Sequence, residues 1–261
     1  SKESLDFLNK SISYIIFLPE MERLFQTSPS YRRNFLDRLV FAHRNDYNRL
    51  INRYKKLIIE RIKILQTNVV DNDWLNQIEK EICILGLEIY NERDLQVRSI
   101  NNNLQLLKYD HNYQFNVELI IKDDYLNNQI TLEEYLSKLR DLRIFDKKFG
   151  GTKIGPHKSD IKFLINDIDA RQILSRGEQK FFSILWSLAQ HEVLKKQYKI
   201  NATLIVDDIK SELDDRVFNL FVETLKHIKT QAIFSCIDDC FSSKIIASLN
   251  EFKKFHVEQL G

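Results

Sequence analysis

The chain has 261 residues, of which 43% are hydrophobic and 29% charged, a balance typical of a packed core beneath a well-solvated surface. Its 39 basic residues nearly cancel its 37 acidic ones, so the net charge of +2 neither demands nor excludes a basic nucleic-acid-binding face. No apolar run approaches the roughly 18 to 20 residues of a membrane-spanning helix, no signal peptide is visible, and three cysteines are too few for a disulfide scaffold, so we expect a soluble, cytoplasmic protein.

The first part of the chain is predicted to be mostly long helix, because glycine and proline are scarce there. The patterns indicate a buried strand over residues 12–18 and a long amphipathic helix over 28–66. A polar break at 68–73 separates this helix from a second long helix over 74–107. Ser28 suits the cap position of the first helix and Pro29 its first turn. Two long helices joined by a short turn form an antiparallel pair, which we expect to be a projecting arm.

A strand is predicted over residues 115–121, and Thr131 opens a capping box that starts a helix reaching about residue 147. Composition then shifts at residues 149–151, and strands begin to alternate with helices. A hairpin is predicted over residues 160–170, with its turn at 166–167, and a helix is predicted after Gly177. Strands and helices alternate over residues 202–235, and a last strand is predicted over 254–258.

The strongest local signal is the segment TLIVDDIKSELD at residues 203–214. A buried apolar strand ends there in two carboxylates, Asp207 and Asp208, and charge beside such a strand is costly unless a cation or hydrogen bonds compensate it. An acid pair at a strand end suits phosphoryl transfer, in which one carboxylate holds Mg²⁺ and the next polarises the attacking water. The alternative is that the two acids merely end a strand and cap a helix.

A second signal is LSRGEQK at residues 174–180, directly before a helix. Ser175 and the free backbone N–H groups around Gly177 lie at the predicted helix N-terminus, which favours an anion such as a γ-phosphate. An ordinary helix cap is the alternative for this motif taken alone. The two segments together, about thirty residues apart and in this order, have the layout of an ABC-type ATPase: signature motif, helix, Walker B strand and D-loop.

Further segments narrow the resemblance to one family. IGPHKSD at 154–160 resembles the GPHRDD segment of RecF proteins, and FLPE at 17–20 with RRNFLD at 32–37 is similar to the RecF segment that leads into the helical lobe. FHVEQ at 255–259 resembles the closing strand. The chain is therefore identified as a member of the RecF family over essentially its whole length.

This resemblance implies an α/β fold: a partial ABC-type ATPase head, with a mostly parallel sheet and flanking helices, plus an inserted helical lobe. The implied domains are the end of an N-terminal ATPase lobe, a helical arm and a C-terminal ATPase lobe, over residues 1–28, 29–149 and 150–261. It also implies a DNA-binding ATPase of recombinational repair, replication and the SOS response. Such a protein acts on single-stranded, gapped or duplex DNA with RecO-like and RecR-like partners.

The resemblance further assigns site residues around ATP and Mg²⁺, which the family holds between two copies of the chain in an ATP-dependent homodimer. Asp207 would organise Mg²⁺ and Asp208 would be the catalytic carboxylate. The signature presented to the other copy would comprise Ser175, Gly177 and Gln179. Asp214 would lie in the D-loop, and residues 235–238, ending at Asp238, fall where the family has its switch segment.

Several positions depart from the family pattern. Glu178 and Lys180 replace the second Gln and the Arg of SQGQQR, and Ser159 replaces a carboxylate of GPHRDD. No G-x-x-x-x-G-K-[ST] loop occurs in the 261 residues, and residues 150–155 have their Lys in the wrong place. We expect the family's first lobe, with its Walker A loop, to precede Ser1. The alternative to an ATPase is a truncated, non-hydrolysing scaffold that binds DNA or a partner, or a decayed gene product.

Weaker candidates are given their ordinary interpretation. Arg32 and Arg33 are expected on a solvated helix face, with contact to a phosphate as the alternative, and the basic residues between 44 and 63 could form either a solvated face or a DNA-facing arm. His157 is interpreted as structural, with binding of a nucleotide or a metal as the alternative. Trp74 and Trp186 are both expected in the core.

Overall fold

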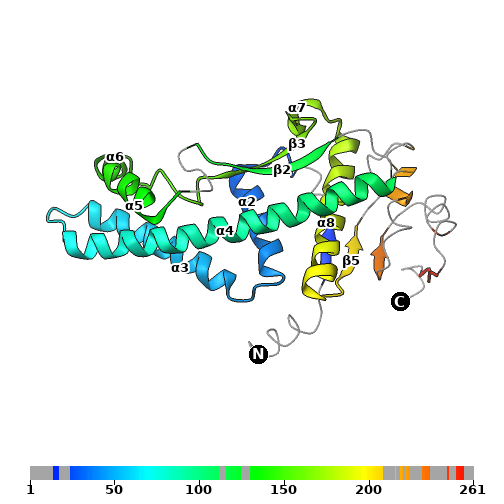
Figure 1. Ribbon diagram of the computed structural model, residues 1–261, viewed down its shortest axis with the longest axis horizontal. Coiled ribbons are helices and arrows are strands. Elements are labelled where there is room, and N and C mark those ends of the chain that lie inside the picture. Colours follow the sequence, from blue (N-terminus) through cyan, green and yellow to red (C-terminus); the bar gives the residue numbers. More distant parts are fainter. Residues whose placement is uncertain are drawn as a thin grey trace. The chain divides into compact units, whose positions relative to one another are not determined.

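The computed structural model describes residues 14–17, 24–111, 116–124, 130–207 and 231–235, with short stretches at 215, 218–219, 221–223, 246 and 251–255; of residues 106–111 it describes the backbone alone. The chain divides into two compact units (Figure 1). We call them the parallel-sheet unit (Ser1–Leu24, Asn103–Gln114 and Arg171–Gly261) and the helical unit (Phe25–Asn102 and Phe115–Ala170).

The parallel-sheet unit is built on three strands in the order β1-β5-β6: β1 (Tyr14–Phe17), β5 (Thr203–Val206) and β6 (Ala232–Phe234). Both pairings are parallel, with Phe17 opposite Val206 and Val206 opposite Phe234. The prediction of a mostly parallel sheet, and of these three strands, is confirmed. Because all three strands run the same way, their carboxyl ends meet at one edge, which is where ligands of such sheets bind.

Helix α8 (Arg176–Tyr198) packs against β1 in this unit. Every residue from Gln179 to His191 is buried, so the helix is enclosed on all sides rather than amphipathic. Trp186 lies among these residues, which confirms its expected place in the core. The helix ends at Lys199, which takes the left-handed conformation (φ 58°) usual for a residue that follows a helix.

The helical unit contains α2 (Pro29–Phe41), α3 (Tyr47–Leu65) and most of α4 (Asn72–His111). The start at Ser28 and Pro29 is confirmed, but the single helix predicted from there to residue 66 is wrong. The chain turns between α2 and α3, where Asp46 makes no side-chain cap, so no glycine, proline or capping motif marks the break. The antiparallel arm of α3 and α4 is present, but Trp74 at its turn is 48% exposed and does not lie in the core.

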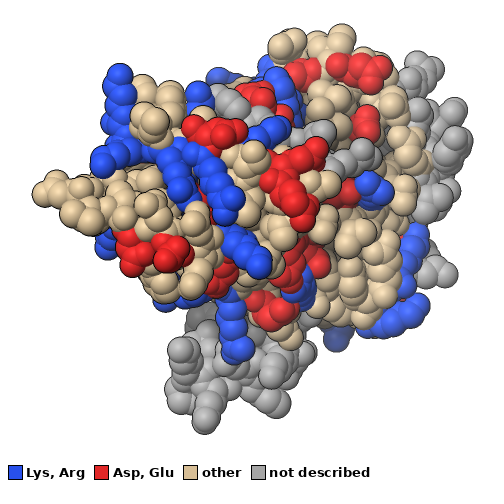
Figure 2. Space-filling view, turned by 60° about the vertical axis from the view of Figure 1, so that its left-hand side comes forward, with Lys and Arg blue, Asp and Glu red and all other residues tan. Residues whose placement is uncertain are grey.

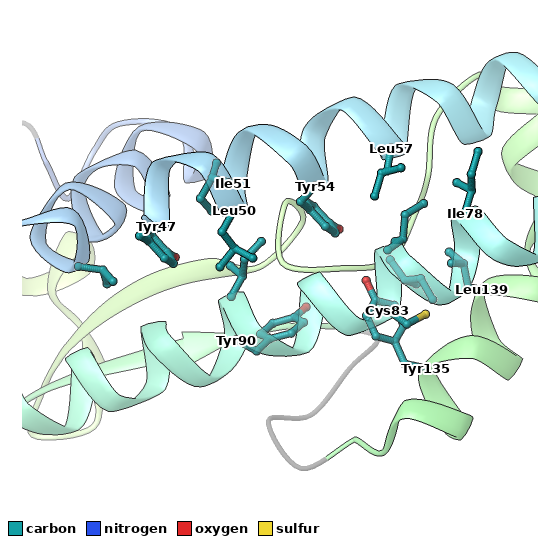
Figure 3. Close-up of a cluster of buried hydrophobic side chains, with 14 residues drawn as sticks. Tyr47, Leu50, Ile51, Tyr54, Leu57, Ile78, Cys83, Tyr90, Tyr135 and Leu139 are labelled. Carbon is teal, nitrogen blue, oxygen red and sulfur yellow. The ribbon is translucent and has the colours of Figure 1, made fainter. Parts of the chain in front are cut away.

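One apolar cluster joins the helices of this unit (Figure 3). α3 contributes a stripe at helical spacing, which includes Tyr47, Leu50, Tyr54 and Leu57, and it packs against side chains of α4. Tyr135 and Leu139 of α5 and Ile154 complete the cluster. The cluster therefore fixes the arm and the segment after residue 150 as one body.

Two short helices follow, α5 (Leu132–Asp141) and α6 (Arg143–Phe149). The capping box is confirmed: Thr131 Oγ1 accepts from the Glu134 backbone N–H, and the Glu134 carboxylate accepts from the Thr131 N–H. The single helix predicted up to residue 147 is wrong, because it is interrupted at Leu142. Gly150 ends α6 in the left-handed conformation (φ 68°), which glycine adopts without cost.

The second sheet has the order β2-β3-β4, from β2 (Val117–Lys122), β3 (Asp160–Ile165) and β4 (Ile168–Asp169), followed by α7 (Ala170–Ile173). The predicted hairpin is confirmed, and Asn166 and Asp167 both have positive φ, as a type I′ turn requires. However, β3 pairs antiparallel with β2, so residues 150–170 pack with the helices and not with the parallel sheet. The boundary expected at residue 149 stays a prediction.

The exposed edge of β2 is covered by a side chain. The Asn101 amide donates to the Leu119 carbonyl and accepts from the Leu119 N–H, both at 2.8 Å. One side chain thus satisfies a backbone pair that a neighbouring strand would otherwise take. Of the predicted last strand at 254–258, residues 254–255 are not in a strand and the others lie outside the described residues.

Candidate nucleotide-binding site

Asp207 lies directly after β5, at the edge where the carboxyl ends of the parallel strands meet. Its carboxylate is exposed and accepts a hydrogen bond from the Ser235 hydroxyl, and Ser235 itself follows β6. The Ser235 backbone N–H also donates to the Val206 carbonyl at 3.0 Å. The strand-end carboxylate and the first residue of the predicted switch segment are therefore side by side.

Ser175 caps α8 in a complete capping box. The Ser175 backbone N–H donates to the Glu178 carboxylate at 3.0 Å, and the Ser175 hydroxyl donates to the same oxygen at 2.8 Å. The Glu178 backbone N–H in turn donates to Ser175 Oγ. Gly177 lies in the first turn, and Gln179 donates from its side-chain amide to the Leu174 carbonyl at 3.0 Å. The helix N-terminus expected at the signature is confirmed, and Ser175 and Glu178 cap it through hydrogen bonds to each other.

The remaining assigned residues, Asp208, Asp214 and Asp238, lie outside the described residues. Among the residues that the structure does describe, no three His, Cys, Asp or Glu side chains form a group that could hold a metal ion. Mg²⁺ in phosphoryl-transfer sites is commonly held by one or two carboxylates, with phosphate oxygens and waters completing the shell. An exposed strand-end carboxylate beside a serine hydroxyl, as at Asp207, fits that donor set.

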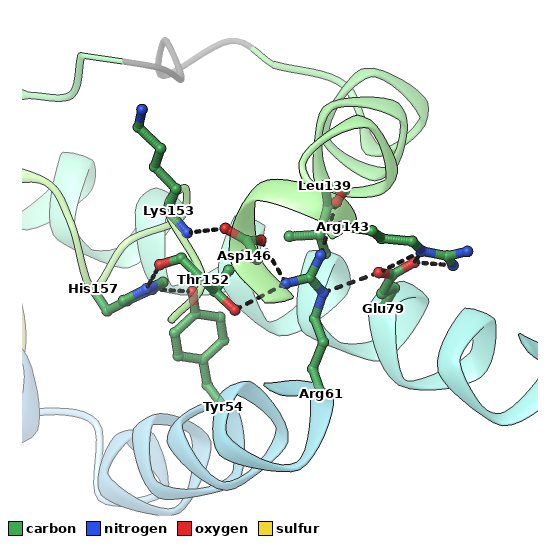
Figure 4. Close-up of polar contacts among 9 residues, drawn as sticks. All are labelled: Tyr54, Arg61, Glu79, Leu139, Arg143, Asp146, Thr152, Lys153 and His157. Atoms are coloured by element: carbon green, nitrogen blue, oxygen red, sulfur yellow. Dashed lines mark hydrogen bonds and ion pairs between the residues drawn. The ribbon is translucent and has the colours of Figure 1, made fainter. Parts of the chain in front are cut away.

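The IGPHKSD segment is a junction within the helical unit, not an exposed loop. The His157 ring lies between the Tyr54 hydroxyl (2.7 Å) and the Thr152 carbonyl (2.9 Å), drawn in Figure 4. Because a carbonyl only accepts, Nε2 carries the hydrogen and Nδ1 accepts from Tyr54. Burial lowers the pKa of His157 from 6.5 to about 4, so the ring is neutral. Its predicted structural role is confirmed.

The same segment binds three arginines, Arg32, Arg33 and Arg93, through contacts that the sequence patterns did not identify. Arg32 makes a two-pronged ion pair with Asp160 at 2.8–2.9 Å and also donates to the Phe25 carbonyl. Arg33 donates to the Ser159 carbonyl, and Arg93 donates to the Pro156 carbonyl, each at 2.6 Å. The expectation that Arg32 and Arg33 lie on a solvated face is therefore wrong. Their guanidinium groups tie α2 to β3 through bonds that local spacing does not reveal.

Arg61 is the centre of a second buried network (Figure 4). It donates to Glu79 at 2.9 Å, to Asp146 at 2.7 Å and to the Leu139 carbonyl at 2.8 Å, and all three charged side chains are fully buried. Burial raises the pKa of Asp146, and the bond from Arg61 opposes that rise. The network joins α3, α4, the end of α5 and α6.

The basic residues between 44 and 63 do not form a continuous free stripe. Arg44 pairs with three carboxylates, those of Asp46, Glu88 and Glu92, and Arg53 pairs with Glu81. Arg61 is buried, as described above. Four basic side chains of this segment remain exposed: Arg49, Lys55, Lys56 and Lys63. Figure 2 shows Lys and Arg interspersed with Asp and Glu on the face it presents. Few unpaired basic side chains are therefore available to support the alternative of a DNA-facing arm.

Comparison with known proteins agrees with these features. No family model matches the chain. The DNA replication and repair protein RecF of Acholeplasma laidlawii is 30% identical over 213 residues, and that of Rickettsia typhi is 32% identical over 220, covering 81% and 83% of this chain. Two solved structures, titled as the recombination mediator protein RecF with ATPrS and with ATP in the RecFOR pathway, superpose with a TM-score of 0.74 at 22% and 23% identity, over 87% and 88% of this chain.

The parallel sheet with its flanking helix, the separate helical unit and the superposed structures define the class of fold: an α/β protein with the fold of the two solved RecF structures. The chain belongs to the RecF family. It spans 59% and 61% of the length of the two relatives named above. Within the described residues, no helix is long and apolar enough to cross a membrane.

Proposed function

We propose that this chain is the part of a RecF-like protein that supplies the signature motif and the Walker B acids to an ATP site in recombinational DNA repair, replication and the SOS response. ATP and Mg²⁺ would lie between two copies of the protein in a homodimer. The single observation that carries the proposal is the position of Asp207 after β5, in contact with Ser235 after β6, at the carboxyl edge of a parallel sheet.

Each residue has a stated role in this proposal. Asp207 holds Mg²⁺, which neutralises the phosphate oxygens, and Asp208 orients and polarises the attacking water. Ser175, Gly177 and Gln179 present the N-terminus of α8 to the γ-phosphate bound by the other copy, and Asp214 contacts the dimer interface. Ser235 keeps the Asp207 carboxylate in one orientation through its hydroxyl.

Partners follow from the family alone. The relatives carry the name of a DNA replication and repair protein, and the superposed structures are titled as part of the RecFOR pathway. We therefore propose binding to gapped, single-stranded or duplex DNA, and association with RecR-like and RecO-like proteins. The alternative is a non-hydrolysing scaffold that binds DNA or these partners.

Asp208→Asn in the complete product of the gene tests the catalytic assignment. We expect ATP turnover to fall by at least about a hundredfold while ATP binding persists, because the amide cannot polarise the water. Asp141→Asn, at an exposed position at the end of α5, is the matched control and should leave turnover unchanged. Turnover that survives in the Asp208 variant would remove the assigned role.

The scaffold alternative gives different results in the same preparation. A complete product that neither contains a Walker A loop nor hydrolyses ATP, yet binds DNA with strong salt dependence or captures a RecR-like protein, supports the scaffold. A product without turnover, DNA binding or partner binding contradicts both proposals.

A further inference from the structure

The face of α6 and the residues after it expose apolar and lysine side chains together. Ile144 is 85% exposed and Phe149 is 64% exposed, although both are large hydrophobic residues. Phe145 packs against Phe149 with ring centroids 4.3 Å apart. Lys147, Lys148 and Lys153 complete what we call the α6 face, which consists of these six side chains.

The apolar side chains of the α6 face are not exposed through fraying of the helix. Asp146, between Phe145 and Lys147, is fully buried and accepts from Arg61 and from the Lys153 backbone N–H. The Gly150 N–H donates to the Asp146 carbonyl at 2.9 Å and closes the helix. A helix that is pinned from beneath in this way keeps Ile144 and Phe149 exposed, and apolar side chains that are held together at a surface mark an interaction site.

Basic side chains predominate in this region. Between residues 142 and 158 the charged side chains are five basic residues and a single acid, Asp146, which is buried and paired with Arg61. The basic set is Arg143, which pairs with Glu79, and Lys147, Lys148, Lys153 and Lys158; the exposed Asp141 lies directly before this range. The ammonium groups lie over the aromatic rings, with Lys153 Nζ 4.2 Å from the Phe145 centroid and Lys148 Nζ 5.8 Å from that of Phe149.

The arrangement of the rings distinguishes between two kinds of acidic partner. Sequence-independent binding of single-stranded nucleic acid uses aromatic rings as free platforms for bases. Here the Phe145 ring is contacted by Phe149 and by the Lys153 ammonium group, and it is only partly exposed. The Phe149 ring is 64% exposed, but it packs against Phe145 and has the Lys148 ammonium group 5.8 Å from its centroid, so neither ring is a free platform. Ile144, the most exposed apolar side chain of the face, offers no platform for a base. An aliphatic and aromatic ridge beside lysines fits a protein segment that alternates carboxylates with apolar side chains.

We infer that the α6 face is a docking surface for an acidic, apolar segment of a partner protein. The carboxylates of that segment meet Lys147, Lys148 and Lys153, and its apolar side chains cover Ile144 and Phe149. The surface lies wholly in the helical unit, and its use does not depend on nucleotide. Its failure would therefore leave the proposed ATP site untouched.

The experiment measures binding of a fluorescent peptide in which glutamates alternate with leucine and phenylalanine. We expect saturable binding that weakens with salt, and about a tenfold loss of affinity in Lys147→Glu/Lys148→Glu and in Ile144→Ala/Phe149→Ala. The matched controls are Lys55→Glu/Lys56→Glu on α3, which makes the same charge change at exposed positions, and Ile59→Ala, which removes a 57% exposed side chain. Both controls should bind like the unaltered protein.

Two outcomes would overturn the inference. One is the absence of saturable peptide binding, or equal losses in the control and α6-face variants. The other is that a single-stranded oligothymidine binds, is lost in the Lys147/Lys148 variant, and outcompetes the peptide, which would make the α6 face a nucleic-acid surface. Circular dichroism of each variant, with an unchanged spectrum and unfolding midpoint, separates loss of binding from loss of fold.

Discussion

Arg61 shows at the residue scale how much one buried charge contributes to this fold. Arg61→Ala would leave two fully buried carboxylates, Glu79 and Asp146, without their common guanidinium partner. Removing one member of a buried ion pair typically costs about 3–5 kcal/mol, because the other charge stays desolvated. We therefore expect the free energy of unfolding, measured by urea titration, to fall by that amount.

Arg53 offers the matched comparison on the same helix. It pairs with Glu81 at 2.8 Å, almost the distance of the Arg61 pair, but its side chain is 54% exposed and that of Glu81 is 42% exposed. Exposed pairs contribute about 0–1 kcal/mol, so Arg53→Ala should change the unfolding free energy little. Equal losses from the two substitutions would show that burial does not decide the strength of these pairs.

Two glycines four positions apart give a second residue-scale prediction. Gly155 has φ of 126°, and a Cβ there would lie 2.3 Å from the Tyr54 hydroxyl and 2.5 Å from that of Tyr135. Gly151 has ordinary φ, and nothing lies within 4 Å of the corresponding position. Gly155→Ala should therefore lower the free energy of unfolding by at least about 2 kcal/mol, while Gly151→Ala stays near neutral. The prediction fails if thermal unfolding midpoints of the two variants coincide.

At the scale of elements, His157 links α3 to the segment before β3, and its titration makes the stability of this contact depend on pH. Its pKa falls from 6.5 to about 4 on folding because of burial, so between these values the unfolded chain binds more protons than the folded one. Stability therefore rises with pH through this window, is complete above about 6.5, and is lost as pH falls towards 4, by on the order of 3 kcal/mol.

His157→Gln isolates this contribution. The amide can still accept from Tyr54 and donate to Thr152, but it does not titrate. Urea titrations at a series of pH values should show a shallower loss of stability between pH 6.5 and 4 in the variant. His43 and His191 are also buried with lowered pKa and remain in both proteins, so the difference between the two curves belongs to His157. Parallel curves would contradict the assignment.

Most single elements could be predicted from sequence because their signals are local. The capping boxes at Thr131 and Ser175, the strand before Asp207 and the turn at Asn166 and Asp167 each depend on neighbours a few residues apart. The breaks at residues 42–46 and at Leu142 have no such signal. They arise where tertiary packing turns the chain although its helical propensity continues, so periodicity alone extends the helices through them.

The organisation of the whole molecule was harder to predict, since it depends on partners far apart in sequence. β2 pairs with a strand beyond two intervening helices, Val117 lying opposite Ile165, and Arg32 pairs with Asp160 across 128 residues. A composition shift near residue 149 predicted a boundary, but residues 150–170 pack with the helices. The candidate site was predictable at Asp207 and Ser175 because family motifs mark it. The capping box that Glu178 forms with Ser175 was not predicted, although the S-x-x-E spacing that produces it is local.

Whether this chain binds nucleotide by itself is a property of the whole molecule. Its 261 residues contain no Walker A loop, and the Ser175 N–H and hydroxyl are already bonded to Glu178. A ligand present at a hundred times its Kd would add about 2.7 kcal/mol to the free energy of unfolding and raise the unfolding midpoint. We expect MgATP to cause no such rise for the isolated chain in a thermal shift assay. The complete gene product, if it supplies a Walker A loop, should show a midpoint that rises with MgATP.

Asp207→Asn gives the comparison that interprets any shift. A saturable rise in the midpoint of the isolated chain that disappears in this variant would mean that strand-end carboxylate and metal suffice to hold the phosphates, contrary to our expectation. A rise that persists in the variant would place the nucleotide away from the carboxyl edge of β5 and β6. An unchanged midpoint agrees with a site whose phosphate-binding half lies outside these 261 residues. The described strand end offers one carboxylate and one hydroxyl, whose oxygens can bind a metal ion but do not surround a triphosphate with N–H donors.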